Sequence, residues 1–124
     1  MAISYVNGQF IPSDKAVIPM EDRGHQFGDG IYEVIAFFNR RMVDMLPHLL
    51  RLERSLDEIR IPHPLPRREL EKLLQELINK NDYEHGGIYL QVTRGAAKRD
   101  HTFSADLKPA LTLSVFGQKT PAAE

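Results

Sequence analysis

Apolar and polar residues alternate over short stretches at the start of the chain, on either side of Asn7-Gly8. This dipeptide is typical of a type I′ turn because both residues tolerate positive φ, so residues 3–11 are predicted as a β-hairpin. The next apolar segment, residues 16–18, is interpreted as another short strand. Residues 31–38 form a longer apolar run of strand length, and residues 42–46 are predicted to pair back beside it.

The middle of the chain changes to a helical period. Leucine and isoleucine recur every three or four residues in 47–59 and again in 67–81, which predicts two amphipathic helices. Pro47 suits the first turn of a helix, where its missing N–H is not needed. A proline-rich connector, with prolines at positions 62, 64 and 66, is expected to separate the two helices.

Strand-like patterns return in residues 88–94 and 110–116, with a polar loop between them. About six strands and two helices are therefore expected, with strands at both ends of the chain and the helices in the middle. This order predicts an α+β fold, a mostly antiparallel sheet with the two helices on one face. Residues 1–117 are predicted to form the domain, and residues 118–124 have the composition of the start of an interdomain linker.

Composition narrows the possible functions. The 124 residues carry a net charge of −1, which gives no reason to expect a nucleic acid or an anionic membrane as partner. There is no cysteine, which excludes disulfides and suits a cytoplasmic protein. No apolar run reaches the roughly 18 residues that span a bilayer. The five histidines show no helical pairing with carboxylates, so no metal site is expected.

Residues 21–30 read Glu-Asp-Arg-Gly-His-Gln-Phe-Gly-Asp-Gly. Glycine is costly inside a helix or strand, so a polar loop is predicted here. The spacing matches neither a Rossmann fingerprint nor a P-loop. The loop could be a tight turn between strands or a place where backbone approaches a bound group. Asp29 and Glu33 are interpreted as ordinary loop and strand carboxylates, with an acid–base pair as the alternative.

Two cationic features could hold an anion. Arg51 lies on the first predicted helix, and its planar guanidinium suits a phosphate or a carboxylate. The alternative is a solvated arginine that pairs with Glu53 or Asp57. Residues 93–101 form either an exposed polar hairpin loop or a loop that holds a substrate carboxylate, with cationic groups at Arg94, Lys98, Arg99 and His101.

Three segments together resemble one known family. Residues 21–34 resemble the early signature of fold-type-IV aminotransferases, and residues 48–52 resemble the next one. Residues 88–95, followed by 99–101, resemble the bacterial D-amino-acid (D-alanine) subgroup in particular. The matches keep their order and spacing from about residue 3 to residue 117, so the resemblance covers nearly the whole chain.

The resemblance implies a pyridoxal 5′-phosphate cofactor and a role for each matching residue. Arg51 would hold the cofactor phosphate. Tyr32 would point into the active site and order the substrate carboxylate or the cofactor, and Tyr89 would line the same pocket. Arg99 and His101 would trap the substrate α-carboxylate, and the neighbouring subunit of a homodimer would supply this trap.

The implied reaction moves an amino group between a D-alanine-like amino acid and a 2-oxo acid. Members of the family continue for about as many residues again, and that second domain carries the Schiff-base lysine. No lysine here matches it, so the chain is expected to be inactive and without cofactor on its own. Two alternatives have a different activity: a 4-amino-4-deoxychorismate lyase domain and a branched-chain aminotransferase domain. A third alternative is a free-standing remnant that binds a partner or ligand without catalysis. One half of a split enzyme is a further alternative.

Overall fold

One sheet and two long helices make up the computed structural model, which describes residues 2–117. The elements in chain order are β1 (Ile3–Val6), β2 (Gln9–Pro12), the short 3-10 helix η1 (Ser13–Lys15), α1 (Arg23–Phe27), β3 (Gly30–Phe38), β4 (Arg41–Met42), α2 (Met45–Glu58), α3 (Arg67–Asn79), β5 (Gly86–Thr93) and β6 (Ala110–Gly117). The predicted start of a linker, residues 118–124, lies outside the described residues.

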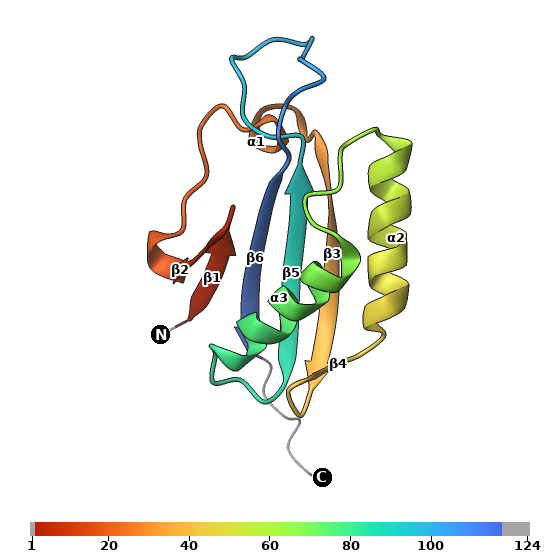
Figure 1. Cartoon of the computed structure of the whole chain (residues 1–124). Helices are drawn as coiled ribbons and strands as arrows, with labels where there is room; N and C mark the ends of the chain where they lie inside the picture. The colour runs from red at the N-terminus through yellow and green to blue at the C-terminus, as the bar shows by residue number, and fades with distance from the viewer. Residues whose placement is uncertain (1, 118–124) are drawn as a thin grey trace.

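The six strands lie in the order β2-β1-β6-β5-β3-β4. Every pair of neighbours is antiparallel. The helices α2 and α3 cover one face of this sheet (Figure 1). The predicted α+β class, with a mostly antiparallel sheet and two helices on one face, is therefore confirmed.

The N-terminal hairpin is confirmed, and the strand predicted after it is wrong. Asn7 and Gly8 have φ angles of 45° and 103°, as a type I′ turn requires. Residues 16–18 pair with no strand among the described residues, and Val17 is 77% exposed. The turn η1 leads the chain away from the sheet edge, so the apolar side chains of this segment have no neighbouring strand to pack on.

The prediction of an irregular loop at residues 21–30 is also wrong in part, because α1 forms there. Asp22 caps the helix by accepting a hydrogen bond of 2.8 Å from the Gly24 N–H. Gly28 ends it in the left-handed region, at φ 64°. Packing explains why Gly24 lies inside a helix: a Cβ there would overlap the Thr93 side chain. Close approach to β5 outweighs the entropic cost of the glycine.

Both predicted long helices are confirmed, but their ends differ from the predicted ones. The first long helix begins at Met45, two residues before the predicted start, and Pro47 lies in its first turn. The strand predicted over 42–46 is correspondingly shorter, because only Met42 of these residues pairs with β3, as the end of β4. The second long helix ends at Asn79 instead of residue 81.

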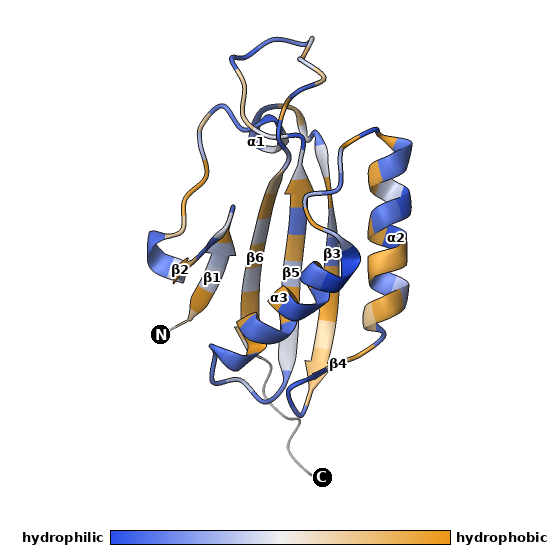
Figure 2. Ribbon diagram, viewed as in Figure 1, coloured by the Kyte–Doolittle hydropathy of each residue, from blue (hydrophilic) through white to orange (hydrophobic). Residues whose placement is uncertain are grey.

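The core lies between the sheet and the two long helices. Cross-strand pairs such as Ile35 with Ile88 and Leu90 with Leu113 point toward the helices. Figure 2 shows orange, apolar segments along β5 and β6 behind α3. The opposite face of the sheet has no helix over it among residues 2–117. It exposes large side chains, namely Tyr32, Val34, Phe38, Tyr89 and Phe116.

No helix in the described part of the chain is long and apolar enough to cross a membrane.

Candidate functional site

The free edge of β3 lies beside an open cavity whose lining includes charged side chains. The short strand β4 pairs only with the end of β3, at Phe37 and Phe38. The rest of that edge has no strand partner within residues 2–117, and α2 packs beside it. An open depression of about 530 Å³ lies there, lined by Gly30, Ile31, Tyr32, Glu33, Val34, Arg51 and Ser55. Two of the residues predicted from the sequence, Tyr32 and Arg51, therefore line one cavity.

Glu33 fixes the orientation of Arg51. The Arg51 Nε and Nη2 groups each donate a hydrogen bond of 2.7 Å to the Glu33 carboxylate, which is only 4% exposed. The His48 Nδ1 atom lies 2.7 Å from the same carboxylate. Burial raises the pKa of Glu33, but the hydrogen bonds and charges of Arg51 and His48 outweigh it and hold this pKa below its ordinary value. Glu33 is thus a buried anion between two groups of α2.

Arg51 keeps donors available after this pairing. A guanidinium has five N–H donors, and Glu33 accepts from only Nε and Nη2. The side chain is 57% exposed. The alternative partners do not bind it, because Glu53 accepts from Arg67 and Asp57 lies 2.8 Å from the His63 ring. An exposed, rigidly held guanidinium with unused N–H groups suits an oxyanion ligand such as a phosphate.

Tyr32 and Tyr89 lie together on the open face of the sheet. Strand alternation puts Tyr32 on the face opposite its neighbour Glu33. The two tyrosine rings are stacked, with centroids 5.4 Å apart and planes 10° from parallel. Tyr32 is 63% exposed and Tyr89 36% exposed. Both aromatic rings are therefore accessible from the side that no helix covers.

Arg99 and His101 lie elsewhere, on the loop between β5 and β6. Figure 1 shows this loop beside α1 at one end of the sheet. The His101 ring is 5.4 Å from the Phe27 ring, and the Arg99 guanidinium is 5.2 Å from the same ring. None of the hydrogen bonds or ring contacts within residues 2–117 joins this pair to Tyr32 or Arg51. The structure thus brings together Tyr32, Tyr89 and Arg51 and leaves Arg99 and His101 apart from them.

Arg94 does not belong to the exposed cationic loop, contrary to one interpretation of the sequence. It is buried, and its guanidinium donates to both oxygens of Asp29, at 2.8 and 3.2 Å. It also donates to the backbone carbonyls of Ile59 and Arg60. Asp29 and Arg94 are neighbours because Gly30 pairs with Thr93, one residue away from each. The register of the two strands, had it been known, would have revealed this ion pair.

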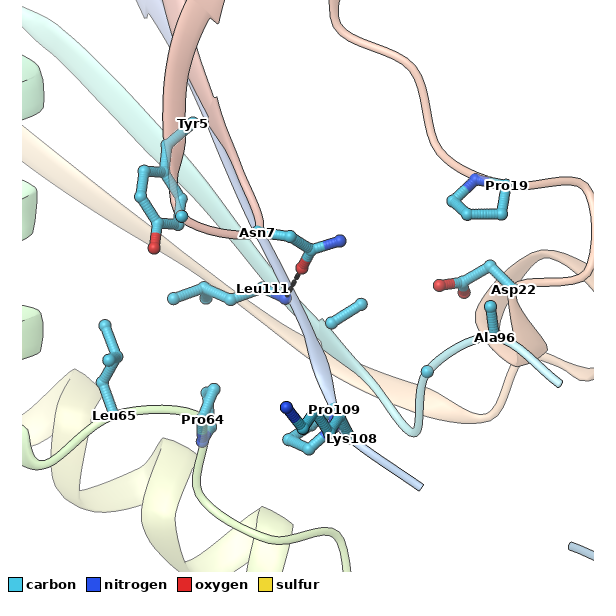
Figure 3. A pocket seen from close by; sticks show the side chains of 13 residues that line it. Tyr5, Asn7, Pro19, Asp22, Pro64, Leu65, Ala96, Lys108, Pro109 and Leu111 are labelled. Atoms are coloured by element: carbon cyan, nitrogen blue, oxygen red, sulfur yellow. Dashed lines mark hydrogen bonds between the residues drawn. The ribbon is translucent and has the colours of Figure 1, made fainter. Parts of the chain in front are cut away.

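A second cavity, of about 380 Å³, lies on the other side of the domain and is shown in Figure 3. It lies between the β1–β2 turn, the start of β6 and the proline connector at Pro64. Its buried carboxylate, Asp22, is already bonded to Gly24 and Thr93. None of the site residues predicted from the sequence lines it. Within residues 2–117, no group of three or more His, Cys, Asp or Glu side chains could hold a metal ion.

The sequence of the chain is similar to that of a curated bacterial aminotransferase. The D-alanine aminotransferase of Bacillus licheniformis is 41% identical to the chain over 118 residues, which are 95% of this chain and 42% of that enzyme. The chain therefore spans less than half the length of this curated relative.

Solved structures share the fold. The branched-chain amino acid aminotransferase of Escherichia coli superimposes with a TM-score of 0.87 at 17% identity, over 94% of this chain and 41% of that one. The 4-amino-4-deoxychorismate lyase of Pseudomonas aeruginosa gives a TM-score of 0.75 at 28% identity, over 98% of this chain and 41% of that one. The sequence model of the amino-transferase class IV family matches residues 30–124. The chain therefore belongs to the class IV aminotransferase family.

Proposed function

We propose that this chain is the N-terminal domain of an aminotransferase that moves an amino group between a D-alanine-like amino acid and a 2-oxo acid. One observation carries the proposal: Arg51 and Tyr32 line the same depression at the free edge of β3. The 41% identity to a D-alanine aminotransferase supports the choice of substrate.

The depression fits the phosphate of pyridoxal 5′-phosphate as a cofactor. Glu33 accepts hydrogen bonds from Nε and Nη2 of Arg51, which leaves other N–H groups unused on a side chain that is 57% exposed. These donors can form charge-assisted hydrogen bonds to phosphate oxygens. When bound, the cofactor supplies the carbon that carries the amino group and an electron-withdrawing ring. The covalent lysine partner of the cofactor is proposed to come from outside this chain.

The substrate would approach from the open face of the sheet. Tyr32 and Tyr89 present their stacked rings there, and their hydroxyl groups can order a carboxylate or the cofactor. Arg99 and His101 would hold the substrate α-carboxylate. Their place beside α1, apart from Tyr32, supports a role in the active site of the neighbouring subunit of a homodimer. A fixed carboxylate leaves the Cα atom in one orientation for proton removal. We further propose a cytoplasmic location for this enzyme.

Substitution of Arg99 tests the substrate assignment in the complete protein. Arg99→Ala is expected to raise the KM for D-alanine about tenfold or more, because a charge-assisted carboxylate contact is lost. Arg54→Ala is the matched control, since Arg54 is an exposed arginine on α2 away from the loop. An unchanged KM in the Arg99 variant would remove the carboxylate role.

Substitution of Arg51 tests the cofactor assignment separately. Arg51→Ala is expected to weaken retention of pyridoxal 5′-phosphate, read from the absorbance of the bound cofactor after dialysis. The same Arg54→Ala protein serves as control. Equal cofactor content in both variants would contradict the phosphate assignment.

The second candidate activity is 4-amino-4-deoxychorismate lyase, favoured by the 28% identity to the Pseudomonas aeruginosa enzyme. Parallel assays of the complete protein with D-alanine and with 4-amino-4-deoxychorismate separate the two. Turnover of the second compound without amino transfer from D-alanine would replace the first proposal by this one.

A further inference from the structure

Arg23 makes an unusual set of contacts for a residue in a five-residue helix. It is only 5% exposed. Its Nε group donates a hydrogen bond of 2.9 Å to Asp29, and its Nη1 group donates one of 2.6 Å to the carbonyl oxygen of Asp100. Its Nη2 group lies 3.5 Å from the carbonyl oxygen of His101. One buried guanidinium therefore links the base of β3 to the backbone of a distant loop.

The same loop is held at a second point. The ring of Phe103 lies 4.8 Å from the Arg23 guanidinium and 4.1 Å from the Arg94 guanidinium. Both arginines bind the Asp29 carboxylate, so the anion fixes the two cations that contact the ring. Cation–π contacts with buried guanidinium groups stabilise such an arrangement.

Phe27, one turn after Arg23 on α1, supports the side chains of the loop. Its ring lies 5.4 Å from the His101 ring and 5.2 Å from the Arg99 guanidinium. The helix α1 thus contacts the loop in two ways, through the backbone at Asp100 and His101 and through the side chains of Arg99 and His101.

The loop has few hydrogen bonds of its own. Between residues 99 and 107 these are the bonds from the Thr102 N–H to the Asp100 side chain, from the Asp106 N–H to the Ser104 side chain and from the Leu107 N–H to the Ser104 carbonyl oxygen. Ordering a free loop costs about 1–2 kcal/mol of backbone entropy per residue, so a loop that must be ordered by each substrate binds it weakly. The contacts from Arg23 to the loop backbone offset part of this ordering cost.

We propose that Arg23 is a positioning residue that sets the geometry of the Arg99–His101 segment and thereby the affinity for the substrate carboxylate. The inference rests on the proposed function for the role of Arg99. Arginine is needed because its planar fork reaches Asp29 with Nε and the loop carbonyl with Nη1 at the same time. A lysine ammonium offers one point charge and cannot make both contacts in this geometry.

The test is steady-state kinetics of the complete protein with Arg23→Gln. Asp29 keeps both hydrogen bonds from Arg94 in this variant, so the ion pair at the base of the loop survives. The KM for D-alanine is expected to rise about tenfold, because the trap is misplaced, while kcat changes less than about twofold. Arg23→Lys is expected to give the same rise in KM, which excludes loss of charge as the cause. It is also the variant to use if the glutamine variant does not fold.

Arg40→Gln is the matched control. Arg40 likewise donates to backbone carbonyls, those of Ile78, Asn81 and Tyr83, but it follows the other end of β3. Its loss is expected to lower stability and leave the KM for D-alanine unchanged. A rise in KM equal to that of the Arg23 variants would show a general structural effect and overturn the inference.

A double-mutant cycle gives the second readout. If Arg23 acts through the Arg99–His101 segment, then Arg23→Lys raises KM by a smaller factor in the Arg99→Ala background than in the wild type. Additive effects, or an unchanged KM in both Arg23 variants of an active enzyme, would overturn the inference alone. Absence of D-alanine transamination in the wild-type complete protein would instead refute the proposed function.

Discussion

The exposed guanidinium of Arg51 donates two hydrogen bonds of 2.7 Å to the buried carboxylate of Glu33. This pair joins α2 to β3 at the edge where no other strand pairs within residues 2–117. Two parallel N–H···O bonds fix the plane of the guanidinium as well as its position. The orientation of the proposed phosphate contact is therefore determined by the sheet and does not depend on a ligand.

Glu33→Gln is predicted to destabilise the domain by about 1–3 kcal/mol. The amide N–H₂ group would face the N–H donors of Arg51, and His48 would lose its charged partner. The measurement is the free energy of unfolding by urea, followed by circular dichroism.

Glu53→Gln is the control for this substitution. Glu53 binds Arg67 with the same two-bond geometry, at 2.6 and 2.7 Å, but the Glu53 side chain is 27% exposed, whereas that of Glu33 is 4% exposed. Surface ion pairs contribute roughly 0–1 kcal/mol. Equal losses in the two variants would contradict the view that burial of Glu33 makes its pair the more important one.

The stability of the domain is predicted to fall in acid because of Glu33 and Asp29. Burial raises the pKa of each carboxyl, but their arginine partners outweigh it and hold both pKa values below the ordinary ones. A carboxyl with a lowered folded pKa stabilises the fold above its unfolded pKa, which is about 4 for these groups. That stabilisation is lost as the pH falls through the folded pKa. Unfolding free energies measured from pH 7 to pH 2 should therefore decrease below about pH 4.

The Glu33→Gln variant measures how much of this loss of stability in acid comes from Glu33. The variant has no carboxyl to protonate at position 33, so its stability should decrease less steeply below about pH 4 than that of the wild type. Parallel pH curves for the two proteins would show that Glu33 has the same pKa in the folded and unfolded states.

The sequence predicts the periodic parts of this fold well. Both long helices follow from leucine spacing, and the hairpin follows from Asn7-Gly8, because these patterns are local. Three motifs in register also indicate the family, which the match over residues 30–124 confirms. The roles of Arg51, Tyr32, Tyr89, Arg99 and His101 stay predictions.

What the sequence does not reveal depends on contacts between distant residues. The helix α1 forms despite Gly24 because that glycine packs against Thr93, 69 positions away along the chain. Glu33 looks like an ordinary strand carboxylate until α2 brings His48 and Arg51 to it. Likewise, Arg94 looks like a loop cation until the pairing of β3 with β5 puts it beside Asp29.

Gly95→Ala is predicted to destabilise the domain severely, by more than about 2 kcal/mol. Gly95 has a φ of 111°, and a Cβ there would overlap the carbonyl oxygen of Lys108. Gly8→Ala is the control, because Gly8 has a similar φ of 103° but nothing within 4 Å of the added Cβ. Thermal unfolding of both variants separates the two effects. Equal losses would mean that backbone strain alone, and not the close approach of the β5–β6 loop, makes the glycine necessary.

Leu74→Ala is predicted to cost about 2–5 kcal/mol, because Leu74 is fully buried between α3 and the sheet. The removed side chain leaves a cavity that the surrounding leucine and isoleucine side chains fill only in part. Leu50→Ala is the control: Leu50 is 46% exposed on α2, and its truncation should change the unfolding free energy by about 0.5 kcal/mol or less. Urea unfolding of the two variants at pH 7 measures both values. A small loss for Leu74 would mean that α3 is weakly packed, and the sheet would then depend mainly on α2 for its covered face.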